Sequence, residues 1–349
     1  MRSLNSKIFF IGNSSNISGG AEKYFQLLFS DFKNYLLSSK IPNHYSLVFL
    51  NLFPISIFIR ALFAKNSLFI FNVSVLFQFV PLLLIASIFR KNTAILPHVV
   101  ASPSLMNPRF LLIRRFLYHL NSFLPSNIIC ISSGNRQQLS SLPFVSTDKF
   151  ITIYNYVNIQ PRKFSRISDL SFPLSIALIG RLQNRQKGQY DLIKANLEFF
   201  RNSDLVLSLY GDGPDYKDLK KLIIKSCLTK KVVLHGHVST NNIFMSDFFS
   251  IVLCYSYWEG LPLNLLEAYS YCKIVIGRDI PGVREIVYPP FMFSSDQHLR
   301  DLLLSLPDLL MDNSIYMGYL SFVNCVLSRY CKSNAMSDLM NYVASNGFA

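Results

Sequence analysis

This 349-residue chain lacks the cysteine patterns that point to metal or disulfide chemistry. Its six cysteines form no CxxC pair, and no histidines stand at the spacing of a zinc site. We therefore expect reduced, mostly buried thiols in a cytosolic protein. The first residues also lack an apolar stretch followed by a small-residue cleavage site, so no secretory signal is expected.

Acidic residues are scarce in the N-terminal half. Residues 1–160 hold 14 Lys or Arg against three acids, a net charge of +11, whereas residues 161–349 hold 20 against 17, or +3. In residues 109–117 the basic side chains are interleaved with Phe, Leu and Ile. This pattern favours a surface for anionic lipid. No nucleic-acid-binding module is visible, so no nucleic-acid partner is predicted.

One hydrophobic run is long enough to raise the question of a membrane span. Residues 66–89 are 24 consecutive uncharged positions, but Asn72, Ser74, Gln78 and Pro81 interrupt them. A buried strand at residues 67–71 followed by a core helix fits both parts of the run. Insertion in a membrane is the alternative.

Strand-like runs alternate with helix-compatible segments along the whole chain, which favours a parallel α/β layout. A polar stretch between Val157 and Phe172, which contains a proline and several charged residues, separates two such series of strands and helices. We predict an N-terminal Rossmann-like domain at 1–160, a C-terminal Rossmann-like domain at 161–326, and a C-terminal helix at 327–349; the sequence leaves open which domain this helix packs on, and packing back on the first is one alternative. The predicted strands are Ile8–Ile11, Ser46–Leu50, Ser67–Phe71, Thr93–Leu96, Ile128–Ile131, Ile151–Ile153, Leu174–Ile179, Leu205–Tyr210, Val232–Leu234, Ile251–Tyr255 and Ile274–Ile276.

Two carboxylates flank a Gly-Leu-Pro turn in residues 258–268. Pro262 falls where a helix would have its first residue, which places Glu267 on the helix and Glu259 on the preceding loop. Backbone N–H groups at a helix start favour anions, so a diphosphate could lie against Gly260 and Leu261 while the carboxylates accept hydrogen bonds from sugar hydroxyls. The element predicts a sugar-nucleotide site. The plainer alternative is a solvated Glu267 and a capping Glu259.

Several short motifs occur in an order typical of one family, and the chain resembles the retaining glycosyltransferases of family 4. This resemblance implies the GT-B fold, an α/β architecture of two Rossmann-like domains with parallel sheets facing across a cleft. It implies that the domain at 1–160 binds the acceptor and that the domain at 161–326 binds the nucleotide sugar. It also implies a surface-polysaccharide enzyme of bacterial type. The Asn155-Tyr156-Val157 segment departs from the family's usual Pro-Asn-Gly form. The motifs are Ser18–Glu22, Asn155–Val157, Gly180–Leu182 with Lys187-Gly188, Tyr210–Pro214, His235–Val238, Glu259–Glu267 and Pro281–Glu285.

The basic residues of the second domain suggest how a leaving diphosphate would be held. Arg181 and Lys187 follow a predicted strand, and a guanidinium with an ammonium could neutralise the diphosphate in place of a metal. The Asp-x-Asp pair with which many sugar transferases bind a metal does not occur in the chain. We predict metal-independent activity with no cofactor. A pair of solvated charges at a domain edge is the alternative.

Further donor-site residues follow from the resemblance together with glycine's freedom to let backbone approach a ligand. Gly19 and Gly20 precede a helix-compatible segment and would face a phosphate or the transferred sugar. Glu267 would accept the ribose hydroxyls, Glu259 would meet the donor sugar, and His98 would face that sugar from the first domain. The alternatives are that the glycines only form tight turns and that His98 has a structural role. The remaining predicted donor contacts are Gly180, Gly211, Gly213, His237, Val238, Gly260, Leu261 and Pro262.

The predicted function is the transfer of a hexose or N-acetylhexosamine, from a UDP-linked donor or, as the main alternative, a GDP-linked one. The acceptor would be lipid-linked or an oligosaccharide in the synthesis of lipopolysaccharide, O-antigen or another surface polysaccharide. The basic, apolar first domain would keep this cytoplasmic enzyme at the anionic inner face of the membrane. A non-catalytic membrane-associated component, a sugar-nucleotide epimerase on the same fold, and an inactive binding protein are the rival predictions.

Overall fold

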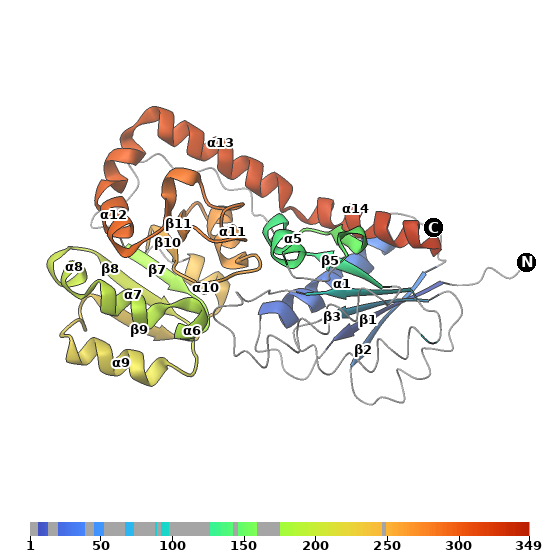
Figure 1. Ribbon diagram of the computed structural model, residues 1–349, viewed down its shortest axis with the longest axis horizontal. Coiled ribbons are helices and arrows are strands. Elements are labelled where there is room, and N and C mark those ends of the chain that lie inside the picture. Colours follow the sequence, from blue (N-terminus) through green and yellow to red (C-terminus); the bar gives the residue numbers. More distant parts are fainter. Residues whose placement is uncertain are drawn as a thin grey trace, which may run out of the picture. The chain divides into compact units, whose positions relative to one another are not determined.

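The computed structural model describes residues 6–12, 20–38, 45–51, 67–72, 88, 92–97, 126–141, 146–158, 175–245 and 249–348. From residue 175 onward, helices separate the strands along the described part of the chain (Figure 1). The chain divides into two compact units, residues 1–155 with 332–349 and residues 156–331.

The first unit contains a six-stranded parallel sheet in the order β2-β1-β3-β4-β5-β6. Every residue of β3 is buried, as expected for a strand in a sheet covered on both faces. This confirms the buried strand predicted at the start of the run 66–89; the core helix predicted after it lies outside the described residues. The strands are β1 (Ser6–Gly12), β2 (Tyr45–Asn51), β3 (Ser67–Asn72), β4 (Asn92–Leu96), β5 (Ser126–Cys130) and β6 (Phe150–Thr152).

No helix in the described ranges is long and apolar enough to cross a membrane. The helices of the first unit include α1 (Gly20–Ser38), α5 (Ser133–Ser140) and the C-terminal α14 (Lys332–Val343), with the short turns η2 (Thr147–Lys149) and η5 (Ala344–Phe348).

The C-terminal helix α14 belongs to the first unit although it follows the second in the chain. Lys332 Nζ lies 2.6 Å from Asp31 Oδ1 on α1. Asn127 Nδ2, on β5, donates to Tyr342 OH over 3.2 Å. These contacts attach both ends of α14 to the first sheet and its helix.

The second unit contains another six-stranded parallel sheet, in the order β12-β11-β10-β7-β8-β9. All eleven strands predicted from the sequence are present across the two units, with ends shifted by one or two residues. Strand β12 was not predicted, because its two residues are too few for a hydrophobic pattern. The strands are β7 (Ser175–Ile179), β8 (Val206–Tyr210), β9 (Val232–Gly236), β10 (Ile251–Cys254), β11 (Ile274–Arg278) and β12 (Met292–Phe293).

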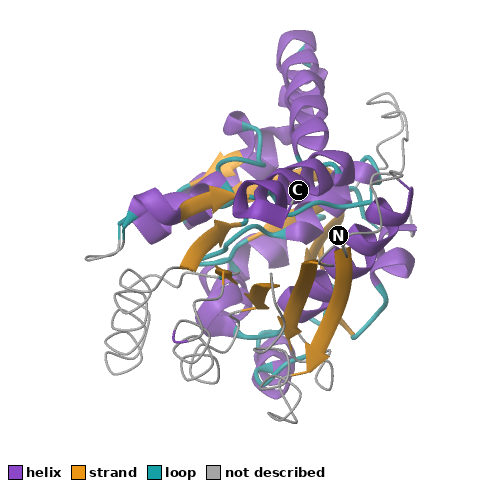
Figure 2. Cartoon of the chain, turned by 90° about the vertical axis from the view of Figure 1, so that its right-hand side faces the viewer, coloured by secondary structure: helices purple, strands orange, loops and turns teal. Residues whose placement is uncertain are grey.

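Helices separate the strands of this unit along the chain, and Figure 2 distinguishes the helices of the molecule from its strands by colour. Local sequence accounts for several helix starts: Ser295 accepts a hydrogen bond from the backbone N–H of His298, and Asp312 accepts from Ser314 and Ile315. The helices are α6 (Asn184–Lys187), α7 (Gln189–Ala195), α8 (Leu197–Asn202), α9 (Tyr216–Lys225), α10 (Thr240–Met245), α11 (Leu263–Ser270), η4 (Pro289–Phe291), α12 (Asp296–Met311) and α13 (Asn313–Arg329).

The strand order reverses direction between β7 and β10. The chain runs from β7 outward to β9, then returns to place β10 on the other side of β7. Loops that follow these two central strands therefore leave the sheet in opposite directions. In open α/β sheets the carboxyl ends of the strands at such a switch point are the usual place for a ligand.

Candidate functional site

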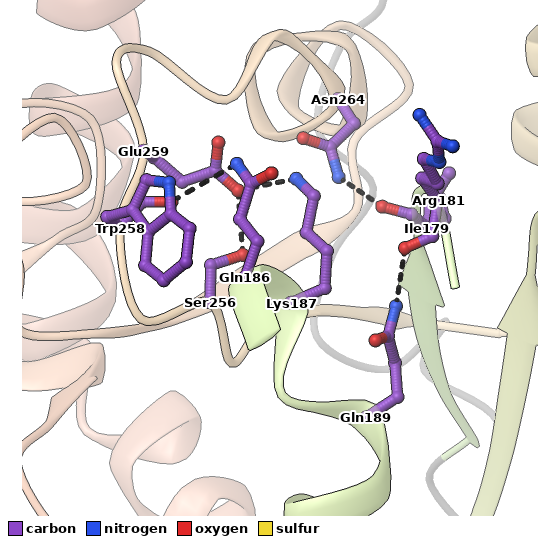
Figure 3. Close-up of polar contacts among 9 residues, drawn as sticks. All are labelled: Ile179, Arg181, Gln186, Lys187, Gln189, Ser256, Trp258, Glu259 and Asn264. Atoms are coloured by element: carbon purple, nitrogen blue, oxygen red, sulfur yellow. Dashed lines mark hydrogen bonds and ion pairs between the residues drawn. The ribbon is translucent and has the colours of Figure 1, made fainter. Parts of the chain in front are cut away.

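Two of the predicted site residues, Lys187 and Glu259, meet at this switch point. Lys187 ends α6, which follows β7, and Glu259 lies in the loop after β10. Lys187 Nζ is 2.5 Å from Glu259 Oε1, and the Glu259 residue is 6% exposed (Figure 3). Ser256 Oγ donates to the same carboxylate oxygen over 2.7 Å. The pair is thus enclosed by protein and is further fixed by a hydroxyl.

Burial by itself lowers the pKa of Lys187, but the charge of Glu259 and its hydrogen bond act in the opposite direction. The net effect raises the pKa of Lys187 above its usual value. The site therefore carries a charged ammonium held against a carboxylate.

The short helix α6 is tied to the loop after β10 along its length. Tyr257 N donates to Gln186 O over 2.8 Å, and Gln186 Nε2 lies 3.4 Å from Trp258 O (Figure 3). Gly188 ends α6 with φ 70°, and a Cβ there would lie 2.7 Å from the Tyr255 ring. Position 188 requires glycine for both reasons. The helix that carries Lys187 and the loop that carries Glu259 consequently form one packed element.

Arg181 lies on the loop after β7 but is not part of this pair. Its side chain is exposed and extends away from Lys187 and Glu259 (Figure 3). Its backbone carbonyl accepts from Nε2 of the buried Gln189 over 2.9 Å, which fixes the path of the loop.

The predicted glycines Gly180, Gly211 and Gly213 bring the loops after β7 and β8 into backbone contact. Gly180 N donates to Tyr210 O over 2.9 Å, and a Cβ at Gly211 would lie 2.0 Å from Gly180 O. A Cβ at Gly213 would meet Leu182 O at 2.3 Å. These close approaches explain glycine there without a ligand. Past β9, His237 is exposed and Val238 is partly buried.

The Gly-Leu-Pro turn leads into α11 as expected, with one correction. Pro262 is the residue before the helix and has φ −77°, whereas the first helical residue is Leu263. A fixed φ near this value suits the extended residue before a helix as well as the first turn. Gly260 and Leu261 are buried, and a Cβ on Gly282 would lie 2.6 Å from Gly260 O.

Glu267 lies on α11, partly buried, one helical turn beyond its start. Within the described residues its carboxylate has neither an ion-pair nor a hydrogen-bond partner. Burial raises its pKa to about 7. Asn264, in the first turn of the same helix, donates to Ile179 O over 2.9 Å and so fixes α11 to the end of β7.

Other predicted residues are outside this site or outside the described ranges. Gly20 is the first residue of α1 in the first unit. Gly19 and His98 fall among the residues that the structure does not describe, so their roles stay predictions. The six cysteines form no disulfide, and only Cys130 and Cys254 of them are buried, so the expectation of mostly buried thiols is wrong. The described residues bring no three His, Cys, Asp or Glu side chains together in an arrangement that could hold a metal ion.

Sequence analysis missed the residues that hold the pair in place. Ser256, Gln186, Gln189 and Asn264 are ordinary polar residues in the sequence. Ser256 donates to the nearby Glu259 carboxylate, and the other three donate to backbone carbonyls distant in the chain or on a loop. Of the four, Ser256 alone directly follows a predicted strand, Ile251–Tyr255, and this place was the signal that could have found it.

Comparison with known proteins finds a family model that matches part of the second unit. Residues 171–291 match the model described as glycosyl transferases group 1. An uncharacterised glycosyltransferase of Methanocaldococcus jannaschii is 38% identical over 120 residues, which cover 33% of this chain and 29% of that protein. The chain thus spans less than a third of the length of this curated relative.

Solved structures extend the likeness to both units. The Anabaena protein HepE, solved in complex with UDP and glucose, has a TM-score of 0.72 at 17% identity, covering 97% of this chain and 100% of that chain. The lipopolysaccharide outer core galactosyltransferase WaaB gives 0.61 at 18% identity, covering 97% and 99%. At such identities the likeness shows the fold alone. It confirms the predicted GT-B fold of two parallel α/β units.

Proposed function

We propose that the glycosyl transferases group 1 domain makes this protein a retaining glycosyltransferase that uses a nucleotide sugar. The observation that carries the proposal is the enclosed Lys187–Glu259 pair at the switch point of that domain. A cation and a carboxylate side by side match the two halves of such a donor, since the diphosphate needs positive charge and the sugar offers hydroxyl donors.

In this function Lys187 would turn from Glu259 to the leaving diphosphate as the donor binds. Arg181, which is exposed on the same loop, would add its guanidinium, with no metal cofactor. Glu259, released from the lysine, would accept hydrogen bonds from the sugar. The glycine loops after β7 and β8, with Gly260 and Leu261 before α11, would lie along the nucleotide and its phosphates, with His237 and Val238 near the base.

Glu267 would accept the ribose hydroxyls. Its lack of a partner among the described residues supports this role, because two hydroxyl donors would stabilise a carboxylate that burial now disfavours. UDP is the proposed nucleotide, with GDP as the alternative. HepE, which shares the fold, has also been solved with UDP-glucose.

For a retaining reaction, we propose that the nucleotide departs and the acceptor attacks on the same face of the sugar, with catalysis mainly by positioning and by stabilisation of the diphosphate charge. His98, Gly19 and Gly20 are further proposed contacts of the donor.

The acceptor follows from the basic first half of the chain. Its net charge of +11 and its basic and apolar interleaving support a lipid-linked or glycan acceptor met at an anionic inner membrane face, in surface-polysaccharide synthesis. A non-catalytic membrane component would leave the enclosed pair without a purpose. An epimerase would need a further carboxylate and histidine constellation.

The test is a thermal shift of the purified protein with UDP, GDP, ADP, CMP or NADH in EDTA, because a ligand raises apparent stability by mass action. We expect a rise with one nucleoside diphosphate that EDTA does not remove and that Arg181→Ala and Glu267→Ala weaken. No rise with any of them would refute the proposal. Retention on anionic vesicles at low salt tests the membrane part separately.

A further inference from the structure

We propose that Arg278 is a positioning residue of the donor site, acting through the loop of residues 255–262. Arg278 ends β11, and its guanidinium carbon lies 4.0 Å from the centre of the Tyr255 ring and 4.8 Å from that of Tyr257. Phe293 lies under it at 5.7 Å. This inference rests on the proposed function, since the loop matters through the Glu259 it presents.

The register of three strands creates the stack. Cys254 pairs with Gly277, and Arg278 pairs with Phe293. Tyr255, the residue after β10, therefore comes level with Arg278 of β11 and Phe293 of β12. The Tyr255 and Phe293 rings are 5.8 Å apart and nearly parallel. A planar guanidinium is the side chain that matches aromatic faces on more than one side.

Each tyrosine is also fixed at its hydroxyl. Tyr255 OH donates to Asp296 Oδ1 over 2.5 Å, and Tyr257 OH donates to Asp191 Oδ2 over 2.6 Å. Burial first, and then the bonds to the carboxylates, raise the pKa of both tyrosines, that of Tyr257 to about 12 in all. A ring whose hydroxyl donates to a carboxylate carries more negative charge on its face, which strengthens its attraction for Arg278.

Arg278 itself is held by rings. In the described part of the chain it makes no ion pair with a carboxylate, and its buried Nε has no hydrogen-bond partner. The neighbouring Asp279 pairs instead with Arg284. The stacking on two tyrosines is thus the main contact of this cation, and its removal would leave both rings without their central support.

The tyrosines transmit this contact to the donor site. Tyr255 fills the space beside Gly188, and Tyr257 N donates to Gln186 O, so both rest against the segment that carries Lys187. Two residues beyond Tyr257 lies Glu259. A shift of either ring would displace Glu259 relative to Lys187, and displacements of about 1 Å cost about 100-fold in rate in positioned reactions.

Trp258 gives a readout that does not depend on activity. It is the only tryptophan of the chain and stands between Tyr257 and Glu259. Its fluorescence and its quenching by acrylamide therefore report on this loop alone.

The experiment compares the full chain with Arg278→Met, which keeps length and loses charge, and Arg278→Lys, which keeps charge and loses the plane. Arg201→Met, an exposed arginine on α8, is the control. We expect Arg278→Met to increase Trp258 quenching and to lower kcat about 10- to 100-fold while the Kd for UDP changes by less than about 3-fold. Arg278→Lys should give quenching and kcat values between those of Arg278→Met and the wild type. Arg201→Met should match the wild type in both.

Unchanged Trp258 quenching and kinetics in folded Arg278→Met would overturn the inference. So would a loss of UDP affinity as large as the loss of kcat, because that would indicate general damage to the unit. If the wild type transfers no sugar, the proposed function fails, whereas the quenching series still decides whether Arg278 positions the loop.

Discussion

The loop of residues 255–262 and the helix α11 that follows it each present one glutamate, and the two glutamates have opposite surroundings. Glu259 is enclosed with Lys187 and Ser256 before any ligand binds. Glu267, eight residues later, has no partner within the described residues, and burial raises its pKa to about 7. The comparison indicates that the loop carries a site already assembled, whereas the helix carries a carboxylate that a ligand would complete.

The largest expected effect comes from removing the cation of the assembled pair. Lys187→Met would leave Glu259 buried beside an apolar chain, and breaking a buried ion pair in this way costs about 3–5 kcal/mol. We expect a large fall in the free energy of unfolding, measured by urea denaturation, and loss of UDP binding.

The matched control is Lys194→Met on the exposed face of α7. The double variant Lys187→Met, Glu259→Gln should recover much of the stability and none of the binding. If Lys187→Met were as stable as the control, the pair would not be the assembled element that the comparison describes.

The next effect concerns the glutamate without a partner. Glu267→Gln should not destabilise the free protein, because it removes a charge that burial disfavours. It should weaken UDP binding about 10-fold, the loss of about 1.5 kcal/mol expected when a charged acceptor of a hydrogen bond becomes neutral. Titration calorimetry measures the affinity. Glu198→Gln, exposed on α8, is the control, and an equal loss of affinity there would contradict the assignment of the ribose site to Glu267.

Only part of this contrast between the loop and the helix could be predicted from the sequence. The strands, the two units and the Gly-Leu-Pro turn followed from hydrophobic runs and turn residues, which act locally. The Lys187–Glu259 contact joins residues 72 positions apart, and no local pattern encodes it. In the sequence, Arg278 is one charged residue near the end of a predicted strand. Only the register of β10, β11 and β12 shows that aromatic rings surround it.

A third prediction uses pH to sharpen the comparison. The folded-state pKa of Glu267 lies near 7 and its ordinary value is 4.5, so the folded state binds this proton more tightly than the unfolded state does. Stability from this group is therefore complete below about pH 4.5 and is lost as the pH rises through about 7. The thermal stability of Glu267→Gln relative to wild type should increase from pH 5 to pH 8, by about 1–2 kcal/mol. A difference that does not change with pH would show that solvent reaches this carboxylate freely.

The smallest expected effect concerns the hydrogen bond that holds Glu259 in the Lys187–Glu259 pair. Ser256→Ala removes one hydroxyl donor from Glu259 and leaves Lys187 in place, so the free energy of unfolding should fall by about 1 kcal/mol. Because the ammonium still neutralises the carboxylate, UDP binding should change little, whereas the rate of sugar transfer should fall as Glu259 gains freedom to turn. Ser270→Ala, which removes a hydroxyl bonded to a backbone carbonyl on α11, is the matched loss of a buried serine outside the pair. Equal kinetics in the two serine variants would show that the Ser256 hydroxyl does not help Lys187 to position Glu259.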